Sequence, residues 1–269
     1  MKLGICILAR NGGNGDVISR MAHDAENAGL DSVWFFDSLG RGNMAIDPLI
    51  GVSVAAAITQ RIEVGIGILE VPLRNPFDLT KSILTAQMAC QGRLLLGVGS
   101  GSTKVDFEAV GKPFDQRHKL LEDGITTMRK LWNGESVAGI SLNPIDQIKG
   151  SPPVFIGSWA GSKWIPRAAR EFDGWIGSAH FAGFNTLKQG IDRFREAGGK
   201  RAIVTNISLD LTAPTELLAD DGDGYNVMCA PAEAKRRLQR LADLGFDDAV
   251  VVHRSDGPPD YAAIRALVS

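Results

Sequence analysis

Short apolar runs alternate along the chain with longer segments in which apolar residues recur every three or four positions. The runs have the length of strands, and the longer segments have the period of amphipathic helices. The pattern predicts eight strands, at residues 2–8, 32–36, 62–69, 93–101, 153–159, 174–179, 201–211 and 247–254. It predicts a helix after each strand, at residues 16–30, 47–60, 75–92, 115–132, 162–172, 185–199, 231–246 and 258–268.

The predicted strands are mostly continuous in apolar residues, which indicates a parallel sheet covered on both faces. Eight strand–helix units in strict order favour an α/β fold, the closed (β/α)8 TIM barrel, with residues 1–269 forming a single domain. An open, doubly wound parallel sheet is the alternative. Residues 133–153 are rich in Gly, Asn and Pro, and we interpret them as an excursion from the barrel.

Charge and composition exclude several classes of binding partner. The chain has 29 Lys and Arg against 31 Asp and Glu, a net charge of −2, which argues against a nucleic-acid surface. Cys6, Cys90 and Cys229 have no Cys-x-x-Cys spacing, so neither a disulfide framework nor a thiolate metal site is expected. The first apolar run is too short for a secretory signal, and no run has membrane-spanning length. We expect a soluble, cytoplasmic protein without a membrane partner.

In a TIM barrel the chemistry lies on the loops that follow the strands. Here those loops are rich in Gly and Ser and poor in paired acids, bases and metal ligands. A hydrolase of this fold would show several carboxylates or histidines there. A barrel lyase or isomerase would need a catalytic Lys or an acid pair, which the chain does not clearly show. The loops therefore favour an organic cofactor acting on a small-molecule substrate.

Four blocks of sequence resemble one known family. They are residues 61–102, 107–132, 153–163 and 172–178. Together they resemble the bacterial luciferase-like flavin and deazaflavin oxidoreductases (luciferase-like monooxygenases), from the first strand to the last helix. The resemblance implies a (β/α)8 barrel, often dimeric, that binds FMN or the deazaflavin coenzyme F420 at its mouth.

The resemblance also implies a set of cofactor-binding residues. Gly67 and Ile68 correspond to a strand bulge where the family carries a non-prolyl cis peptide behind the cofactor ring. Ser100, Gly101 and Ser102 line the ring or its side chain. The phosphate is expected at the loop of Gly157, Ser158, Trp159, Ala160, Gly161 and Ser162, where a helix start offers amides and hydroxyls. A plain capped helix start, with Ser162 as the cap, is the alternative for this loop.

Two residues are the catalytic candidates. Asp37 ends the second strand, where the family places an acid beside the ring, and an Asx turn is its alternative. His180 follows the sixth strand, although a lone loop histidine can also be a surface residue. Ser38 replaces a histidine common in the family and is taken as a further cofactor contact. Ser102 stands where F420-dependent sugar-phosphate dehydrogenases carry Glu, which argues against that activity.

We favour F420-dependent hydride transfer to or from a small organic substrate, because residues 67–76 and the compact length resemble the deazaflavin members more. The alternatives are a monooxygenase that uses reduced FMN and O2, and a member that has lost cofactor chemistry and acts as a binding protein. We also expect a homodimer through the apolar helices 47–60 and 75–92. Residues 212–231 are expected to form a mobile lid that contacts ligand through Tyr225.

Overall fold

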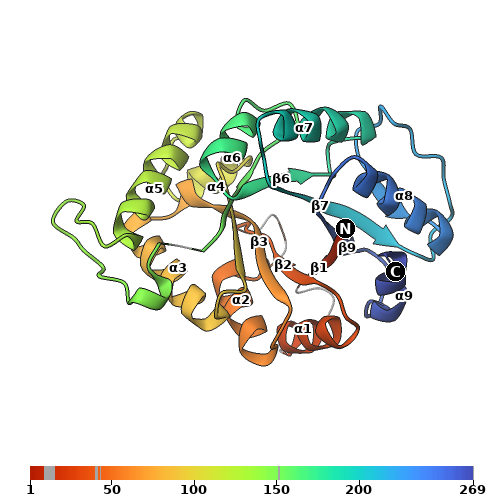
Figure 1. The fold of residues 1–269 in the computed structure, drawn as a ribbon, viewed down its shortest axis with the longest axis horizontal. Coiled ribbons are helices and arrows are strands. Elements are labelled where there is room, and N and C mark those ends of the chain that lie inside the picture. The colour runs from red at the N-terminus through yellow and green to blue at the C-terminus, as the bar shows by residue number, and fades with distance from the viewer. Residues whose placement is uncertain (9–15, 40–41, 43, 151, 269) are drawn as a thin grey trace.

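A closed ring of parallel strands surrounded by helices makes up the protein (Figure 1). The computed structural model describes residues 1–8, 16–39, 42, 44–150 and 152–268. Eight strands follow one another around the ring and β9 pairs with β1, so the predicted (β/α)8 barrel is confirmed and the open sheet is wrong. The ring consists of β1 (Lys2–Cys6), β2 (Ser32–Phe35), β3 (Glu63–Glu70), β4 (Leu94–Gly99), β5 (Val154–Gly157), β6 (Gly174–Ser178), β7 (Arg201–Asp210) and β9 (Asp248–His253).

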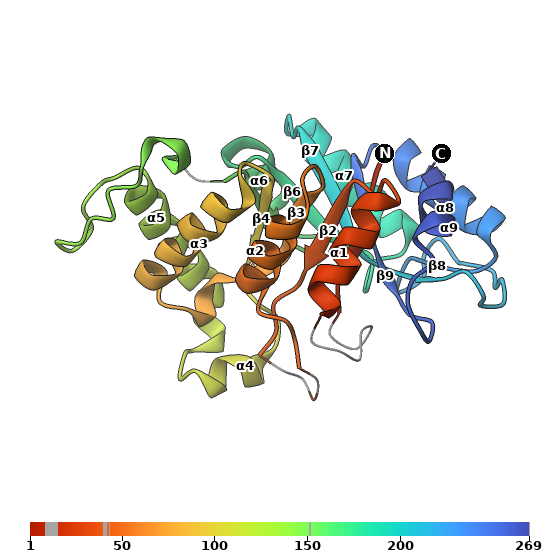
Figure 2. The ribbon, with the colours of Figure 1, turned by 90° about the horizontal axis from the view of Figure 1, so that it is seen from below.

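The helices cover the outside of the ring. They are α1 (Val17–Asn27), α2 (Pro48–Ile58), α3 (Pro76–Cys90), α4 (Lys104–Ala109), α5 (Arg117–Trp132), α6 (Ile165–Glu171), α7 (Phe184–Glu196), α8 (Pro231–Asp243) and α9 (Tyr261–Arg265). The short α4 follows β4 and lies at the carboxyl end of the strands, whereas both chain termini lie at the opposite end (Figure 2). None of these helices is long and apolar enough to cross a membrane, within the part of the chain that the structure describes.

Local capping explains where α2 and α3 begin. The Asp47 carboxylate accepts hydrogen bonds from the amides of Leu49 and Ile50, and the Asn75 side chain accepts one from Phe77. In both cases proline occupies the first helical position, where its missing N–H costs nothing.

Helix α6 begins later than predicted. The Ser162 hydroxyl accepts a hydrogen bond from the Trp164 amide at 3.1 Å and closes a turn, so the helix starts at Ile165 instead of Ser162. Pro166 then lies in the first turn and does not interrupt the helix.

A ninth strand, β8 (Asn226–Met228), pairs in parallel with the last residues of β7 and is not part of the ring. It lies within the segment that the sequence predicted to be a lid. Tyr225 is only 2% exposed, and its hydroxyl donates to the carbonyl of Arg237 at 2.9 Å. The prediction that Tyr225 contacts ligand is wrong, because this side chain is an anchor beneath α8.

The interior of the ring is filled below the carboxyl end. Its apolar layer consists of Cys6, Leu8, Trp34, Leu95, Phe155, Ile176, Ile203, Val250 and Val252. At the amino end, Arg201 binds both Glu63 and Asp248, with nitrogen–oxygen distances of 2.7 Å to each. Asp248 is fully buried, so this pair seals the bottom of the barrel with satisfied charge.

Two strands of the ring carry bulges. Between the pairs Ile66–Leu96 and Leu69–Val98, β3 has one residue more than β4, and the peptide between Gly67 and Ile68 is cis, as predicted. In β7 the extra residue lies between the pairs Val204–Ala249 and Ile207–Val251. A bulge turns a side chain away from its place in the regular strand and is common beside functional sites.

Candidate functional site

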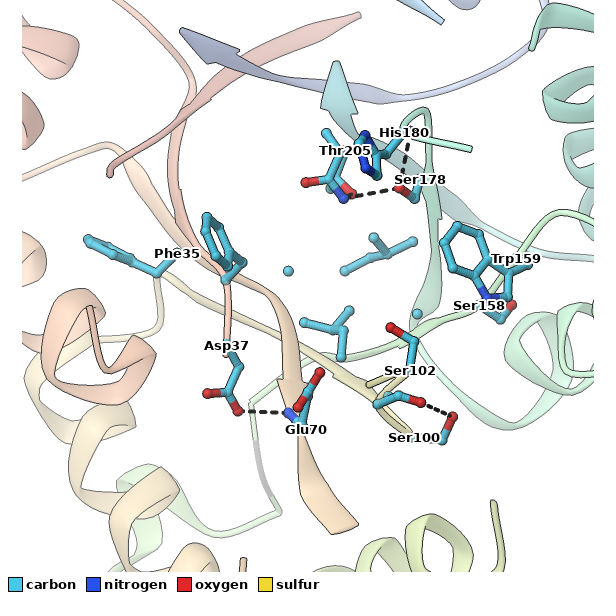
Figure 3. A pocket seen from close by; sticks show the side chains of 18 of the residues that line it. Phe35, Asp37, Glu70, Ser100, Ser102, Ser158, Trp159, Ser178, His180 and Thr205 are labelled. Carbon is cyan, nitrogen blue, oxygen red and sulfur yellow. Dashed lines mark hydrogen bonds between the residues drawn. The ribbon is translucent and has the colours of Figure 1, made fainter. Parts of the chain in front are cut away.

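A cavity of about 740 Å³ opens at the carboxyl ends of the strands (Figure 3). Its volume is within the range of small-molecule and cofactor sites, roughly 300–1,000 Å³. Most of the predicted site residues line it: Asp37, Gly67, Ile68, Ser100, Gly101, Ser102, Gly157, Ser158, Trp159, Ser162 and His180. Ser38, Ala160 and Gly161 lie beside the cavity and not in its wall; Ala160 is buried and Gly161 is exposed.

The β3 bulge turns Ile68 into the cavity wall. A Cβ on Gly99 would lie 2.7 Å from the Ile68 Cδ1, and one on Gly157 would collide with the Ile68 Cγ2. These glycines are therefore required by Ile68 itself. A Cβ on Gly67 would lie 3.1 Å from the Trp34 ring. The missing side chain of Gly67 thus points at Trp34, and Gly67 also lines the cavity.

Asp37 is fixed by a buried ion pair. Its carboxylate binds the Arg74 guanidinium through both oxygens and also accepts from the Glu70 amide at 2.9 Å. Burial lowers the pKa of Arg74, but the hydrogen bonds and charges of Asp37, Asp47 and Glu70 outweigh burial and raise it. The Asp37 carboxylate is thereby fixed in the wall of the cavity, next to Glu70.

Glu70 brings a second carboxylate to the cavity. Its position after the β3 bulge allows it to point either into the cavity or to solvent; its side chain is 4% exposed and lines the cavity beside Asp37 (Figure 3). The 3-10 turn Val71–Leu73 follows β3 directly after Glu70. A buried carboxylate at a cavity wall is a candidate acid–base group.

The loop between β5 and α6 offers hydrogen-bond donors. The Ser162 amide donates to the Trp159 carbonyl at 2.8 Å, so it is engaged within the loop. Across the described chain, no acceptor binds the amides of Trp159, Ala160 or Gly161. The Ser158 hydroxyl oxygen accepts from the Trp175 indole at 3.1 Å, which leaves its own proton to donate. Consecutive free amides of this kind form concavities that bind anions.

Basic side chains on α5 and after β9 line the cavity, and sequence reasoning missed those on α5. Arg117 and His118, at the start of α5, line the cavity, as does Arg254 after β9. Burial, together with the charges of Arg117 and Lys163, lowers the pKa of His118. The sequence places Arg117 in a predicted helix, and the signal that could have exposed it is its position in the first turn after the strand-4 loop.

Three aromatic side chains cluster at the cavity. The rings of His180 and Phe181 lie 4.0 Å apart, and Phe181 lies 5.7 Å from Trp159. Trp159 and Phe181 are 48% and 64% exposed. Trp159 and His180 both face the cavity in Figure 3.

The β7 bulge supplies polar residues that sequence reasoning missed. Thr205 and Asn206 line the cavity, and Asn206 has a φ of 60°. Its Nδ2 donates to the Ser178 Oγ at 3.0 Å. Two consecutive polar residues inside an apolar strand are the signal that could have identified them. Over the described residues, no group of three or more potential metal ligands is gathered.

Comparison with known proteins gives consistent matches. The family model described as luciferase-like monooxygenase matches residues 1–223. An uncharacterised protein of Mycobacterium tuberculosis is 27% identical over 186 residues, which are 65% of this chain and 64% of that protein. The F420-dependent glucose-6-phosphate dehydrogenase of Amycolatopsis mediterranei is 30% identical over 145 residues, 51% of this chain and 43% of that enzyme.

Solved structures agree on the fold. The coenzyme F420-dependent tetrahydromethanopterin reductase from Methanopyrus kandleri superposes with a TM-score of 0.73 at 17% identity, covering 99% of this chain and 96% of that one. The chain spans 64% of the length of the mycobacterial relatives that it matches.

Proposed function

The chain belongs to the luciferase-like monooxygenase family, and on that premise we propose that it is an oxidoreductase that uses coenzyme F420 to transfer hydride to or from a small organic substrate. The observation that carries the proposal is the set of free donors in the loop that borders the cavity: the amides of Trp159, Ala160 and Gly161. They suit the phosphate of a flavin-type cofactor, because an anion there would receive several hydrogen bonds at once.

The residues around the cavity fit such a cofactor. The hydroxyls of Ser158 and Ser162 each accept one hydrogen bond within the protein and retain a proton to donate to a phosphate. Arg117 also lines the cavity and adds positive charge to it. Ser100 and Ser102 line the cavity between the loop and the β3 bulge and can hydrogen-bond a polar side chain.

When bound, F420 supplies a carbon that gives or accepts hydride. The chain itself must hold the substrate and move a proton. Glu70 and His180 are the groups proposed for proton transfer, since both line the cavity. Asp37 is proposed to hold its position through Arg74 and to keep the Glu70 backbone in place.

Open space beside the phosphate loop favours F420 over FMN. Gly161 is exposed, and no heavy atom lies within 4 Å of a Cβ built on it. F420 continues beyond its phosphate into a further chain, which needs such space, whereas FMN ends at the phosphate. Ser102 does not provide the carboxylate of the sugar-phosphate dehydrogenases, so a sugar phosphate is not the proposed substrate.

Titration with F420 and FMN tests this proposal. Gly161→Asp should weaken cofactor binding about tenfold or more, because a like charge would face the phosphate and its Cβ has room. Arg254→Ala is the matched control, because its Nε binds Ser208 and not the loop; it should change affinity little. Fluorescence or absorbance after desalting measures both.

Each other outcome has a defined meaning. If Arg254→Ala weakens cofactor binding more than Gly161→Asp does, the phosphate binds at the end of β9 instead. Tighter binding of FMN than of F420 would favour the monooxygenase alternative. Binding of neither cofactor to the unmutated protein would contradict the proposal and favour a binding protein that has lost cofactor chemistry.

A further inference from the structure

The two bulges of the barrel face each other. β3 and β7 stand four places apart in a ring of eight strands, so they are on opposite sides. A Cβ on Gly67, in the β3 bulge, would lie 3.5 Å from the Thr205 Cγ2 in the β7 bulge. The two bulges therefore meet at the cavity. Asn206 follows Thr205 toward the carboxyl end of β7, and Gly67, Thr205 and Asn206 all line the cavity.

Asn206 adopts a backbone conformation that few residues tolerate. Its φ of 60° is left-handed, which Asn accepts more readily than most side chains. The Nδ2 amide donates to Ser178 Oγ at 3.0 Å and lies 3.5 Å from Thr205 Oγ1. Both amide hydrogens are thus directed at the protein, and the Asn206 Oδ1 is left to accept.

Ser178 complements Asn206. Its Oγ accepts from Asn206 Nδ2 and from the His180 amide at 3.3 Å, so both lone pairs are used. What Ser178 retains is its hydroxyl proton. The β6–β7 edge of the cavity therefore presents one acceptor, Asn206 Oδ1, next to one donor, the Ser178 hydroxyl.

We propose that Asn206 and Ser178 bind a ring edge in which an N–H lies beside a carbonyl, and that this edge is the pyrimidine ring of the cofactor. The inference rests on the proposed function. The pair shares the cavity with the candidate phosphate loop and lies across from the β3 bulge. Both F420 and FMN carry such an edge, at ring position N3. A site built to hydrogen-bond a polar group discriminates strongly against an analogue that lacks it.

Asn206→Gly is the decisive variant. Glycine adopts a φ of 60° without strain, so the backbone of the bulge is kept while the amide is removed. Asn143→Gly is the matched control, since Asn143 is exposed, has a φ of 45° and does not line the cavity. Each protein is titrated with F420, FMN and the N3-methyl derivative of each.

The unmutated protein should bind the N3-methyl derivatives about tenfold more weakly than the parent cofactors. Asn206→Gly should bind the parent cofactors about tenfold more weakly and should no longer distinguish the methylated ones. Asn143→Gly should behave like the unmutated protein. Ser178→Ala is a second variant and should lose part of the affinity for the parent cofactors.

Two results would overturn the inference, and they are distinguishable. If the unmutated protein binds a cofactor but neither methylation nor the Asn206 and Ser178 variants change its affinity, the ring-edge site is wrong and the proposed function stands. If the unmutated protein binds neither F420 nor FMN, the proposed function fails and the ring-edge site fails with it.

Discussion

Ile68 shows how one displaced side chain dictates the identity of its neighbours. The bulge turns it against β4 and β5, where only glycine at positions 99 and 157 leaves room. From the sequence alone, the Gly-rich strand ends predict contact with a ligand. The packing gives those glycines a structural cause, while the same bulge still shapes the cavity wall.

Gly67→Val should destabilise the protein by about 1–3 kcal/mol, because the new side chain would press on Trp34. Gly161→Val is the matched control, since nothing lies within 4 Å of its Cβ, and its stability should barely change. Urea unfolding measures both. A Gly67→Val protein of unchanged stability that has lost cofactor binding would show that the side chain faces the cavity after all.

The part of the candidate site that lies in the loops directly after the strands could be predicted from the sequence. Asp37, His180 and the β5–α6 loop could be located from the topology, since parallel strands bring their carboxyl ends together. Arg74 and Asn206 could not. Arg74 lies just after the 3-10 turn that follows β3 and binds Asp37, which is 37 residues earlier in the sequence. Asn206 enters the site only because β7 has one extra residue.

Among the elements, helices with local capping signals were the easiest to predict. Asp47 and Asn75 act within three residues of themselves, so the sequence alone locates α2 and α3. β8 is three residues long and exists only because it pairs with the far end of β7. No local pattern reveals such a strand. The sequence therefore predicts a mobile segment over residues 212–231, although Tyr225 binds this segment to α8.

Tyr225→Phe tests that anchor. Loss of the hydrogen bond to Arg237 should cost about 1 kcal/mol at neutral pH. Burial raises the pKa of Tyr225 from 10 to about 12. The folded protein thus favours the protonated phenol, so its contribution is complete below pH 10 and is lost as pH rises toward 12. The loss of stability reaches roughly 2.7 kcal/mol, and the Tyr225→Phe variant should not show it.

Tyr261→Phe is the control for that experiment. Burial also raises the pKa of Tyr261, but its hydroxyl has no hydrogen-bond partner among the described residues. This variant should keep or gain stability at neutral pH. Urea unfolding at pH 7 separates the two variants, whereas at pH 11 both should lose less stability than the unmutated protein. Equal effects of both variants at pH 7 would mean that Tyr225 does not anchor the segment.

At the scale of the whole molecule, α2 and α3 carry apolar side chains that the protomer does not cover. Much of the apolar surface of α2 and α3 packs within the protomer, through Ala55, Ala56, Leu79, Ile83, Leu84 and Ala86. Ile50, Ile58 and Met88 remain 62%, 38% and 52% exposed. Exposed apolar residues on neighbouring helices are typical of an interface.

We therefore expect a two-fold dimer through α2 and α3. Ile50→Glu together with Met88→Glu should convert it to a monomer, because charge would be buried at the interface. Leu217→Glu is the control, since Leu217 is 99% exposed in another part of the chain. Light scattering at micromolar concentration measures the mass. A strictly monomeric unmutated protein would contradict the prediction.

The sealed lower half of the barrel fixes the order in which ligands can come and go. Arg201 and its carboxylates close one end, and the layer of side chains around Trp34 fills the space above them. Traffic therefore passes through the mouth between Trp159, Phe181 and Arg117. Whatever lies on the floor must arrive first and leave last. A cofactor held there would therefore bind before the substrate and leave after the product.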